Sequence, residues 1–496
     1  MFTGGTYNHN VTTNTSPQDQ GIQDLSKIAS RGAMHDSSAR VPHPKCHPES
    51  RRRIVEAFIA WIKNPNPPEP EHVRWLNAPF GHGKSAVMQT IVDTLLSTGF
   101  AHLVAGAFFF GPGHVDAHDL LPTIAYQIAI NIPGMRELIN EAVMRDPTIP
   151  SKSMELQLCH LIVEPLLALA DGLHHIHHPT ILIDGLDECA TTAAQRSVLD
   201  IVADALVKHK LPLRFIVASR PESHIQLKFQ VQPLSQLSKF IELENDLQAK
   251  LDMGAFLVDS FDAIYEGHLE VMSEVPKPWP SAQEITELII RANGQYVYLT
   301  TVVTFVDAEF FDPVSQLDVV LKGRPDYSEV SNIDFLYRQI LQRVPKAHRT
   351  VLQHILASLV IARHNSAAFR EERVELPKLV ELLTVHVIAD IWDHTKQQIL
   401  LVSQALQGVT KLNRAWTSEE IPNQCPPDFI ETFNPPYLQP RHHSFLEFLE
   451  DENRAGEFYC NRKLAEAEWI SRSQSLLKDA LRYKYVPRVA FIKLCI

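Results

Sequence analysis

The sequence predicts an α/β fold in which helices cover both faces of a parallel sheet, followed by two accessory domains built mainly of helices. Helix-like and strand-like runs alternate between residues 46 and 230. The strands in this stretch are continuous apolar runs, which is typical of parallel strands that are buried on both faces. Past residue 230 the strand signal fades and helical runs dominate.

Size and composition limit the class of protein. At 496 residues the chain is about three domains long, on a scale of ~150 residues per domain. Hydrophobic residues at 45% and charged residues at 21% exclude a mostly disordered, collagenous or coiled-coil chain. The 46 Lys and Arg against 58 Asp and Glu give a net charge of −12. This balance argues against a general polyanion binder, so no nucleic-acid partner is expected.

Residues 1–45 are predicted to be a mostly unfolded leader, because they are rich in Gly, Ser, Thr, Asn, His and Pro. One short amphipathic piece, IQDLSKIA, interrupts this composition. The start of the chain lacks the basic and apolar regions of a signal peptide, and no apolar run approaches the ~18 residues of a membrane span. We therefore expect a cytoplasmic protein without a transmembrane segment.

The six cysteines lie far apart and form no C-x-x-C pair. We expect reduced thiols rather than a zinc site or a disulfide framework. Four histidines cluster in the stretch DGLHHIHHP, namely His174, His175, His177 and His178. A single polar loop rarely fixes the geometry that a metal requires, so this stretch is predicted to be a solvated surface loop.

The first folded segment is predicted to be a helix in ESRRRIVEAFIAWIK, where apolar residues recur at helical spacing. The run HVRWLNAP is a short strand that leads through GHGKS into the helix AVMQTIVDTLLSTG. Further strands are expected at 103–110, 180–184 and 213–219, and further helices at 120–132, at 154–170 and in AAQRSVLDIVADALVKH. Together these elements make up the predicted sheet domain, residues 46–230.

The accessory region is predicted to be helical at 284–306, 335–344, 350–362, 378–383 and 394–409. A division near Pro345 gives a small helical domain, residues 231–345, and a mixed domain, residues 346–460. The last stretch, residues 461–496, carries eight Lys and Arg against three Asp and Glu. It is predicted to be a basic helical extension with a solvated face, and a phosphate-binding or membrane-surface patch is the alternative.

The segment APFGHGKS, residues 78–85, matches the phosphate-binding loop G-x-x-x-x-G-K-[ST] except at its first position. The candidate nucleotide-binding residues are Gly81, His82, Gly83, Lys84, Ser85 and Ala86. Backbone N–H groups of such a loop point at phosphate oxygens, and the following helix adds its positive end. Lys84 supplies a cation for the β and γ phosphates, and the Ser85 hydroxyl is a candidate Mg²⁺ ligand.

Two residues of this loop are unusual. Ala78 stands where the first glycine is expected, and a position that needs φ above 0° would cost an alanine about 1 kcal/mol. His82 is expected to face solvent, and the alternative is a phosphate contact when the ring is protonated.

Acidic residues follow a buried strand in the string TILIDGLDECA. Asp184 ends the strand, at the sheet edge where open α/β folds bind ligands, and is therefore a candidate Mg²⁺ ligand facing Ser85. Asp187 or Glu188 is a candidate to orient the attacking water. The alternative for all three is a solvated acidic turn.

An arginine follows the next apolar strand in LRFIVASRPE. Arg220 can reach a γ-phosphate from that strand end and report its presence. Its alternative role is a surface salt bridge.

With these strings, the chain resembles the NACHT family of signal-transducing P-loop ATPases, in the fungal branch with a nephrocystin-3-like N-terminal domain. The matching pieces are KCHPESRR, RWLNAPFGHGKSAVMQTI, GAFFF, LLPTIAYQIA, ILIDGLDEC, FIVASRPE, ANGQYVYLTTVV, FLYRQIL and HHSFLEFL, across residues 45–460. The resemblance implies a P-loop NTPase sheet, a small helical domain and a winged-helix domain that close over ADP and open with ATP.

The resemblance also implies site residues. It places a histidine that faces the ADP β-phosphate at His442, and the alternative is a histidine that only begins a helix. Residues 294–296, Gly-Gln-Tyr, replace the Gly-x-Pro of many relatives, so Tyr296 or Tyr298 is a candidate to stack on the adenine. In such proteins a ligand-sensing repeat array usually follows the winged helix; none is predicted in this sequence, which is expected to be a short form or an incomplete one.

These observations predict a slow ATPase that binds ATP or ADP with Mg²⁺ and acts as a conformational switch that self-associates in its ATP state. A protein partner of unknown kind is expected. Two alternatives stay open: a scaffold whose loop has lost nucleotide binding through Ala78, and a phosphotransferase acting on a small molecule.

Overall fold

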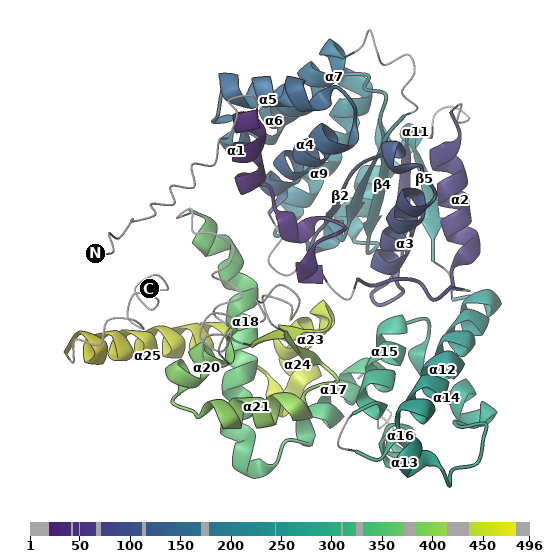
Figure 1. Ribbon diagram of the computed structural model, residues 1–496, viewed down its shortest axis with the longest axis vertical. Helices are drawn as coiled ribbons and strands as arrows, with labels where there is room; N and C mark the ends of the chain where they lie inside the picture. The colour runs from purple at the N-terminus through teal and green to yellow at the C-terminus, as the bar shows by residue number, and fades with distance from the viewer. Residues whose placement is uncertain are drawn as a thin grey trace, which may run out of the picture.

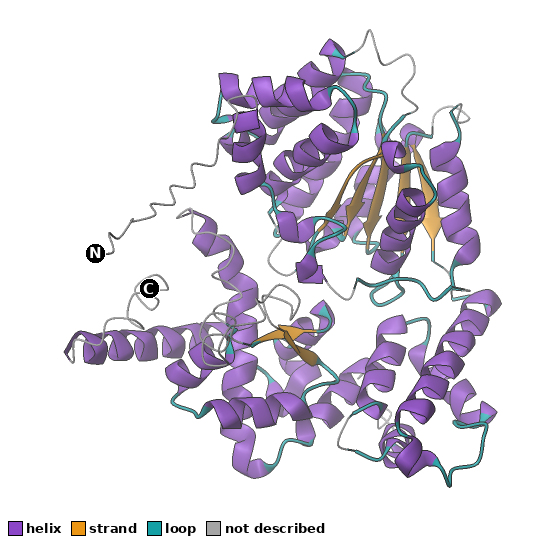
Figure 2. Cartoon of the chain, viewed as in Figure 1, coloured by secondary structure: helices purple, strands orange, loops and turns teal. Residues whose placement is uncertain are grey.

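The computed structural model describes residues 19–40, 43–48, 50–65, 71–111, 116–169, 178–243, 245–308, 311–323, 331–371, 383–413 and 436–482 (Figure 1). A sheet packed between helices forms one part, and a mainly helical part lies beside it (Figure 2). No helix within these ranges is both long enough and apolar enough to cross a lipid bilayer.

The predicted α/β fold is confirmed by a five-stranded parallel sheet in the order β2-β3-β4-β1-β5. Its strands are β1 Val73–Asn77, β2 Val104–Phe109, β3 Thr180–Asp184, β4 Arg214–Ser219 and β5 Ser238–Glu242. Almost every residue of β1 to β4 is buried, as continuous apolar runs predict. The edge strand β5 was not predicted, because it is mostly exposed and has no apolar run. It extends the sheet domain past the predicted end at residue 230.

Helices cover both faces of this sheet. The helices of this part are α2 Arg52–Lys63, α3 Lys84–Ser97, α4 Leu120–Asn131, α5 Met135–Arg145, α6 Met154–Leu158, α7 Glu164–Ala168, α9 Thr192–Ala203, α10 Ser223–Gln230 and α11 Leu234–Leu237. One cluster of buried side chains joins α2 and α3 to one face, and a second joins α4 and α9 to the other. Neighbouring strand residues such as Leu182 and Ile183 therefore enter different clusters.

The predicted unfolded leader is wrong for residues 19–40. Helix α1, Gln20–Ile28, packs on α4 and α5 through its buried residues Ile22 and Leu25. The amphipathic piece therefore has a partner surface, which composition does not reveal. A Cβ at Gly21 would lie 2.4 Å from the Asn140 carbonyl oxygen, so this contact requires glycine. Residues 1–18 lie outside the described residues.

The helical part begins with α12 Leu247–Gly267, α13 Leu269–Met272, α14 Ala282–Ala292, α15 Tyr296–Val306, α16 Pro313–Lys322 and α17 Asn332–Gln342. It continues with α18 Arg349–Glu371, α20 Val385–Trp392, α21 Lys396–Ala405, α23 His443–Leu449, α24 Glu452–Ala455 and α25 Arg462–Arg482. The single helix predicted at 284–306 is in fact α14 and α15, because Asn293 and Gly294 adopt φ values of 45° and 87° and end α14. The predicted helix at 378–383 falls almost entirely outside the described residues.

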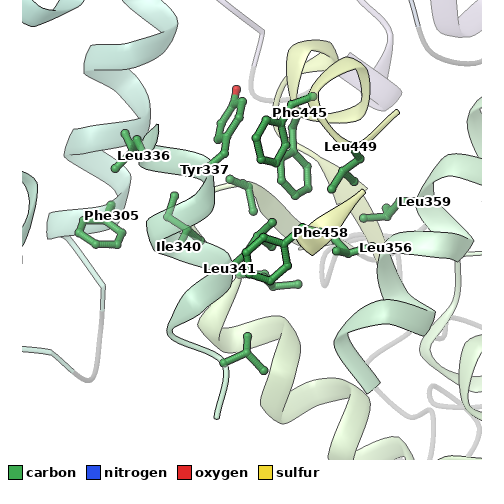
Figure 3. Close-up of a cluster of buried hydrophobic side chains, with 14 of the residues drawn as sticks. Phe305, Leu336, Tyr337, Ile340, Leu341, Leu356, Leu359, Phe445, Leu449 and Phe458 are labelled. Atoms are coloured by element: carbon green, nitrogen blue, oxygen red, sulfur yellow. The ribbon is translucent and has the colours of Figure 1, made fainter. Parts of the chain in front are cut away.

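One hydrophobic cluster runs through the helical part, from Met253 to Trp469. Helix α17 lies within it: Phe305, Leu336 and Ile340 gather on one side, and Tyr337 packs its ring edge-on against Phe445 (Figure 3). Since this cluster crosses Pro345, the boundary predicted there stays a prediction. The winged-helix domain also remains a prediction. In this region α18, α20 and α21 are followed by an antiparallel strand pair, β6 Thr410–Asn413 and β7 Tyr437–Pro440.

The C-terminal stretch contains the predicted helix, α25, and this helix has a buried face as well as a solvated one. Ala465 and Trp469 are buried in the cluster of the helical part. Ion pairs between neighbouring turns, such as Arg462 with Glu466, lie on the outside. Residues 483–496 lie outside the described residues.

Candidate nucleotide-binding site

The loop between β1 and α3 uses glycine where its backbone requires it. Gly81 and Gly83 have φ values of 77° and 89°. Ala78 has no positive φ, since the non-glycine residues with one, in the described ranges, are Arg51, Lys210, Asn293 and Asp393. The missing first glycine therefore imposes no backbone strain on the loop.

The N-terminus of α3 presents free donors beside a buried cation. The first helical hydrogen bond runs from the Val87 N–H to the Gly83 carbonyl, so the N–H groups of Lys84, Ser85 and Ala86 have no acceptor within the helix. Lys84 folds back over the loop and donates from Nζ to the carbonyl oxygens of Ala78 at 2.8 Å and Pro79 at 3.2 Å. Burial lowers the pKa of its ammonium. Such an arrangement suits an anion at this helix end.

Asp184 and Ser85 meet at the carboxyl end of β3, as predicted. Asp184 is buried, and burial raises the pKa of its carboxyl to about 6, against a lowering contribution from hydrogen bonding with Ser85. Its Oδ1 atom is buried and has no hydrogen-bond partner. An unsatisfied buried carboxylate oxygen beside a hydroxyl fits the oxygen ligands that Mg²⁺ prefers.

The two acids that follow play different parts. Asp187 uses both carboxylate oxygens on Arg220: Oδ1 accepts the backbone N–H at 2.9 Å, and Oδ2 lies 3.0 Å from Nε. Asp187 thus positions Arg220, and this pairing favours Glu188 over Asp187 as the residue that orients a water. No ion pair of Glu188 is found in the described ranges, and burial first, then Asp187, raises the pKa of its carboxyl to about 8. Glu188 remains the candidate for the water.

Arg220 connects the sheet edge to the helical part. Its Nη2 atom lies 2.8 Å from Oε1 of Glu447 on α23. Its guanidinium carbon also lies 5.0 Å from the ring centroid of Phe80, in the loop. The surface salt bridge considered from sequence is therefore a half-buried bridge between two parts of the protein.

His442 lies against the same loop. Its ring centroid is 4.8 Å from that of Phe80, at an interplanar angle of 78°. It also caps α23, since its Nδ1 accepts the Ser444 N–H at 3.2 Å. Burial lowers the pKa of this imidazole to about 4, so the ring is neutral near pH 7 and carries its proton on Nε2. An Nε2–H donor is what a contact with phosphate requires.

His82 does not face solvent, contrary to the sequence prediction. It is 7% exposed, and its Nδ1 lies 3.0 Å from the Phe80 carbonyl oxygen. A Cβ at Gly294 would lie 2.7 Å from its Nε2, so the ring packs against the turn before α15. Burial lowers its pKa, which disfavours the protonated phosphate contact.

The two tyrosines that are candidates to stack on the adenine differ in position. Tyr298 is 3% exposed and belongs to the cluster of the helical part, so it has no free ring face. The Tyr296 ring lies beside the loop, with its Cδ2 atom 4.0 Å from a Cβ built at Gly83. Its hydroxyl hydrogen-bonds Ser50 at 2.8 Å.

Two site residues were not predicted from the sequence: Glu447, and Arg40, whose positive charge acts on the Asp184 carboxyl. Glu447 could have been found as the acid within HHSFLEFL, five residues past His442. Arg40 gives no such signal, because it lies in a stretch that reads as unfolded.

Comparison with known proteins supports one part of the resemblance. Residues 54–220, about a third of the chain, match the family model described as Nephrocystin 3, N-terminal. The match spans the loop, the acidic string and Arg220, and confirms the nephrocystin-3-like similarity over these residues. No curated protein matches the chain. A solved structure of Drosophila ORC bound to AT-rich DNA and Cdc6 aligns with all of this chain and 76% of that one, at 9% identity and a TM-score of 0.28, too low to carry a conclusion.

Proposed function

We propose that this chain is a nucleotide-dependent signalling switch of the NACHT type, which binds ATP or ADP with Mg²⁺ and hydrolyses ATP slowly. The observation that carries the proposal is the position of Arg220. It pairs with Asp187, beside the phosphate loop, and with Glu447, on a helix of the other part of the protein. A ligand at the loop can therefore change a contact between the two parts.

The loop residues supply binding. The N–H groups at the start of α3 and the Lys84 ammonium would hold the phosphates. Ser85 and Asp184 would hold Mg²⁺, which neutralises phosphate charge when bound. Lys84 would leave the carbonyl oxygens of Ala78 and Pro79 to reach the nucleotide.

We attribute slow ATP hydrolysis to the protonation state of Glu188. A carboxyl with a pKa near 8 is mostly protonated at pH 7 and is then a poor general base. A site whose general base is mostly protonated hydrolyses ATP slowly. Slow hydrolysis suits a protein that signals by which nucleotide is bound rather than by how fast it turns ATP over.

The switch depends on differential affinity. A γ-phosphate near Arg220 competes with Glu447 for the same guanidinium, whereas the His442 Nε2–H suits the β-phosphate of ADP. ATP would thus weaken the bridge to α23, and ADP would keep it. Separation of the two parts would expose surfaces for self-association, and we include an ATP-dependent oligomer in the proposal.

Small-angle scattering of the full chain tests this function. With MgADP, the radius of gyration should stay at the value of the closed form. With Mg²⁺ and a non-hydrolysable ATP analogue, the radius or the molecular mass should rise. Identical profiles with both nucleotides would reject the switch, and absence of nucleotide binding would favour the scaffold. A phosphorylated small molecule after incubation with ATP would favour the phosphotransferase.

A further inference from the structure

A strap of the chain, residues 30–40, lies at the edge of the sheet domain that faces the helical part (Figure 1). Its first residue is fixed to α4, because the Ser30 N–H donates to Oγ1 of Thr123 at 2.8 Å in a buried contact. Its last residue, Arg40, donates from Nη1 to Oε1 of Gln89 on α3, also at 2.8 Å. The strap is therefore tied to the helix that follows the phosphate loop.

The Arg40 side chain is held in one place. Its Nη1 atom also lies 3.3 Å from the carbonyl oxygens of Met34 and His35, within the strap itself. The Gln89 amide closes the arrangement by donating to the His35 carbonyl at 3.1 Å. The guanidinium carbon lies 3.4 Å from the ring centroid of Phe109, a stacking contact that favours a cation.

The Arg40 guanidinium is held next to the two candidate Mg²⁺ ligands, Ser85 and Asp184. Phe109 ends β2 and stands directly opposite Asp184 of β3 in the sheet register. Gln89 lies one helical turn after Ser85, on the same side of α3. The charge of Arg40 accordingly acts on Asp184, and Arg40 stays protonated at neutral pH although burial lowers its pKa to about 10.

We propose that Arg40 is a positioning residue built into the magnesium end of the site, and that docking of the strap opposes binding of a divalent cation at Ser85 and Asp184. This inference rests on the proposed function. The Arg40 guanidinium and a divalent cation would both lie near the Asp184 carboxylate and would repel each other. The docked guanidinium therefore lowers the affinity of the site for the metal. The coupling is reciprocal: metal binding loosens the strap by the same factor.

The test measures binding of a fluorescent ADP to the full chain, in EDTA and across a magnesium titration. Arg40→Gln keeps a polar side chain and removes the charge, and should lower the magnesium concentration at the midpoint on the order of tenfold. Arg40→Lys should restore the wild-type midpoint. Arg31→Gln is the matched control, since Arg31 lies in the same strap with an exposed guanidinium.

The affinity for ADP in EDTA distinguishes an effect of Arg40 on the metal from a role in the fold or a contact with phosphate. If Arg40 merely supported the fold or touched phosphate, Arg40→Gln would weaken ADP binding in EDTA and leave the midpoint unchanged or higher, and either result would overturn the inference. Hydrogen exchange gives a second readout, because the Ser30 amide should exchange faster with MgADP than with ADP in EDTA. Failure of the wild type to bind ADP, or equal binding by Lys84→Ala, would reject the proposed function itself.

Discussion

Arg220 and Glu447 are separated by 227 positions in the chain, yet their side chains lie 2.8 Å apart. The first directly follows the central strand β4, and the second lies on helix α23 of the other part of the protein. Both side chains are only about a quarter exposed, so solvent screens the pair less than a surface salt bridge. This pair links the site to the relative placement of the two parts.

Removal of this link should favour the open form. Glu447→Gln keeps the size of the side chain and leaves Arg220 paired with Asp187, so the closed form should lose on the order of 1 kcal/mol, about a fivefold shift in population. Small-angle scattering with MgADP measures the shift. Glu452→Gln, at an exposed site on α24, is the control. A closed form as populated as in the wild type would contradict the role of Glu447.

Glu188→Gln should abolish hydrolysis and stabilise the fold at alkaline pH. The raised pKa means that the folded chain holds a proton that the unfolded chain has lost, so Glu188 destabilises the fold as the pH rises from about 4.5 to about 8. Glutamine removes this penalty, which is on the order of a few kcal/mol at pH 8 and small at pH 5. Denaturant unfolding at both pH values tests the sign. Equal gains at pH 5 and pH 8 would show that the carboxyl has an ordinary pKa.

Wild-type hydrolysis should rise with pH, because Glu188 accepts a proton only when ionised. The rate of phosphate release from ATP should increase between pH 7 and pH 9. A flat profile in that interval would exclude Glu188 as the base.

Ala78→Gly should leave nucleotide binding almost unchanged. Ala78 has a negative φ and is fully buried, so glycine relieves no strain and only adds freedom to the unfolded chain. Titration with a fluorescent nucleotide should give affinities within about twofold of each other, and unfolding should show a loss on the order of 1 kcal/mol. A large gain in affinity would mean that alanine impairs the loop.

Leu25→Ala tests the docking of α1. Leu25 is fully buried among residues of α4 and α5, so its truncation should cost about 2–5 kcal/mol. Lys27→Ala, on the exposed side of α1, should cost less than about 0.5 kcal/mol. Urea unfolding of both variants makes the comparison. Equal stability of the two would return residues 19–40 to the unfolded leader.

The parts of the fold that the sequence predicts are those with local signals. Strands β1 to β4 are apolar runs, and the loop has a fixed spacing of Gly83, Lys84 and Ser85, so both can be found without tertiary information. Asp184 was placed correctly because parallel strands end at one sheet edge.

The missed features depend on contacts between distant segments. Within the described ranges strand β5 pairs with β1 alone and is largely exposed, so its residues carry no apolar pattern. The burial of His82 depends on Gly294, more than two hundred positions away. Arg40 is fixed by Gln89 and Phe109, and no periodicity connects these residues.

The proposed switch requires, before anything else, that the loop holds a nucleotide. Denaturing the purified chain and identifying any released nucleotide by chromatography measures this. We expect ADP or ATP at close to one per chain from the wild type, and none from Lys84→Ala with its helical content unchanged. An empty wild-type protein that also fails to bind added nucleotide, or equal amounts of nucleotide in both proteins, would contradict nucleotide binding at this loop.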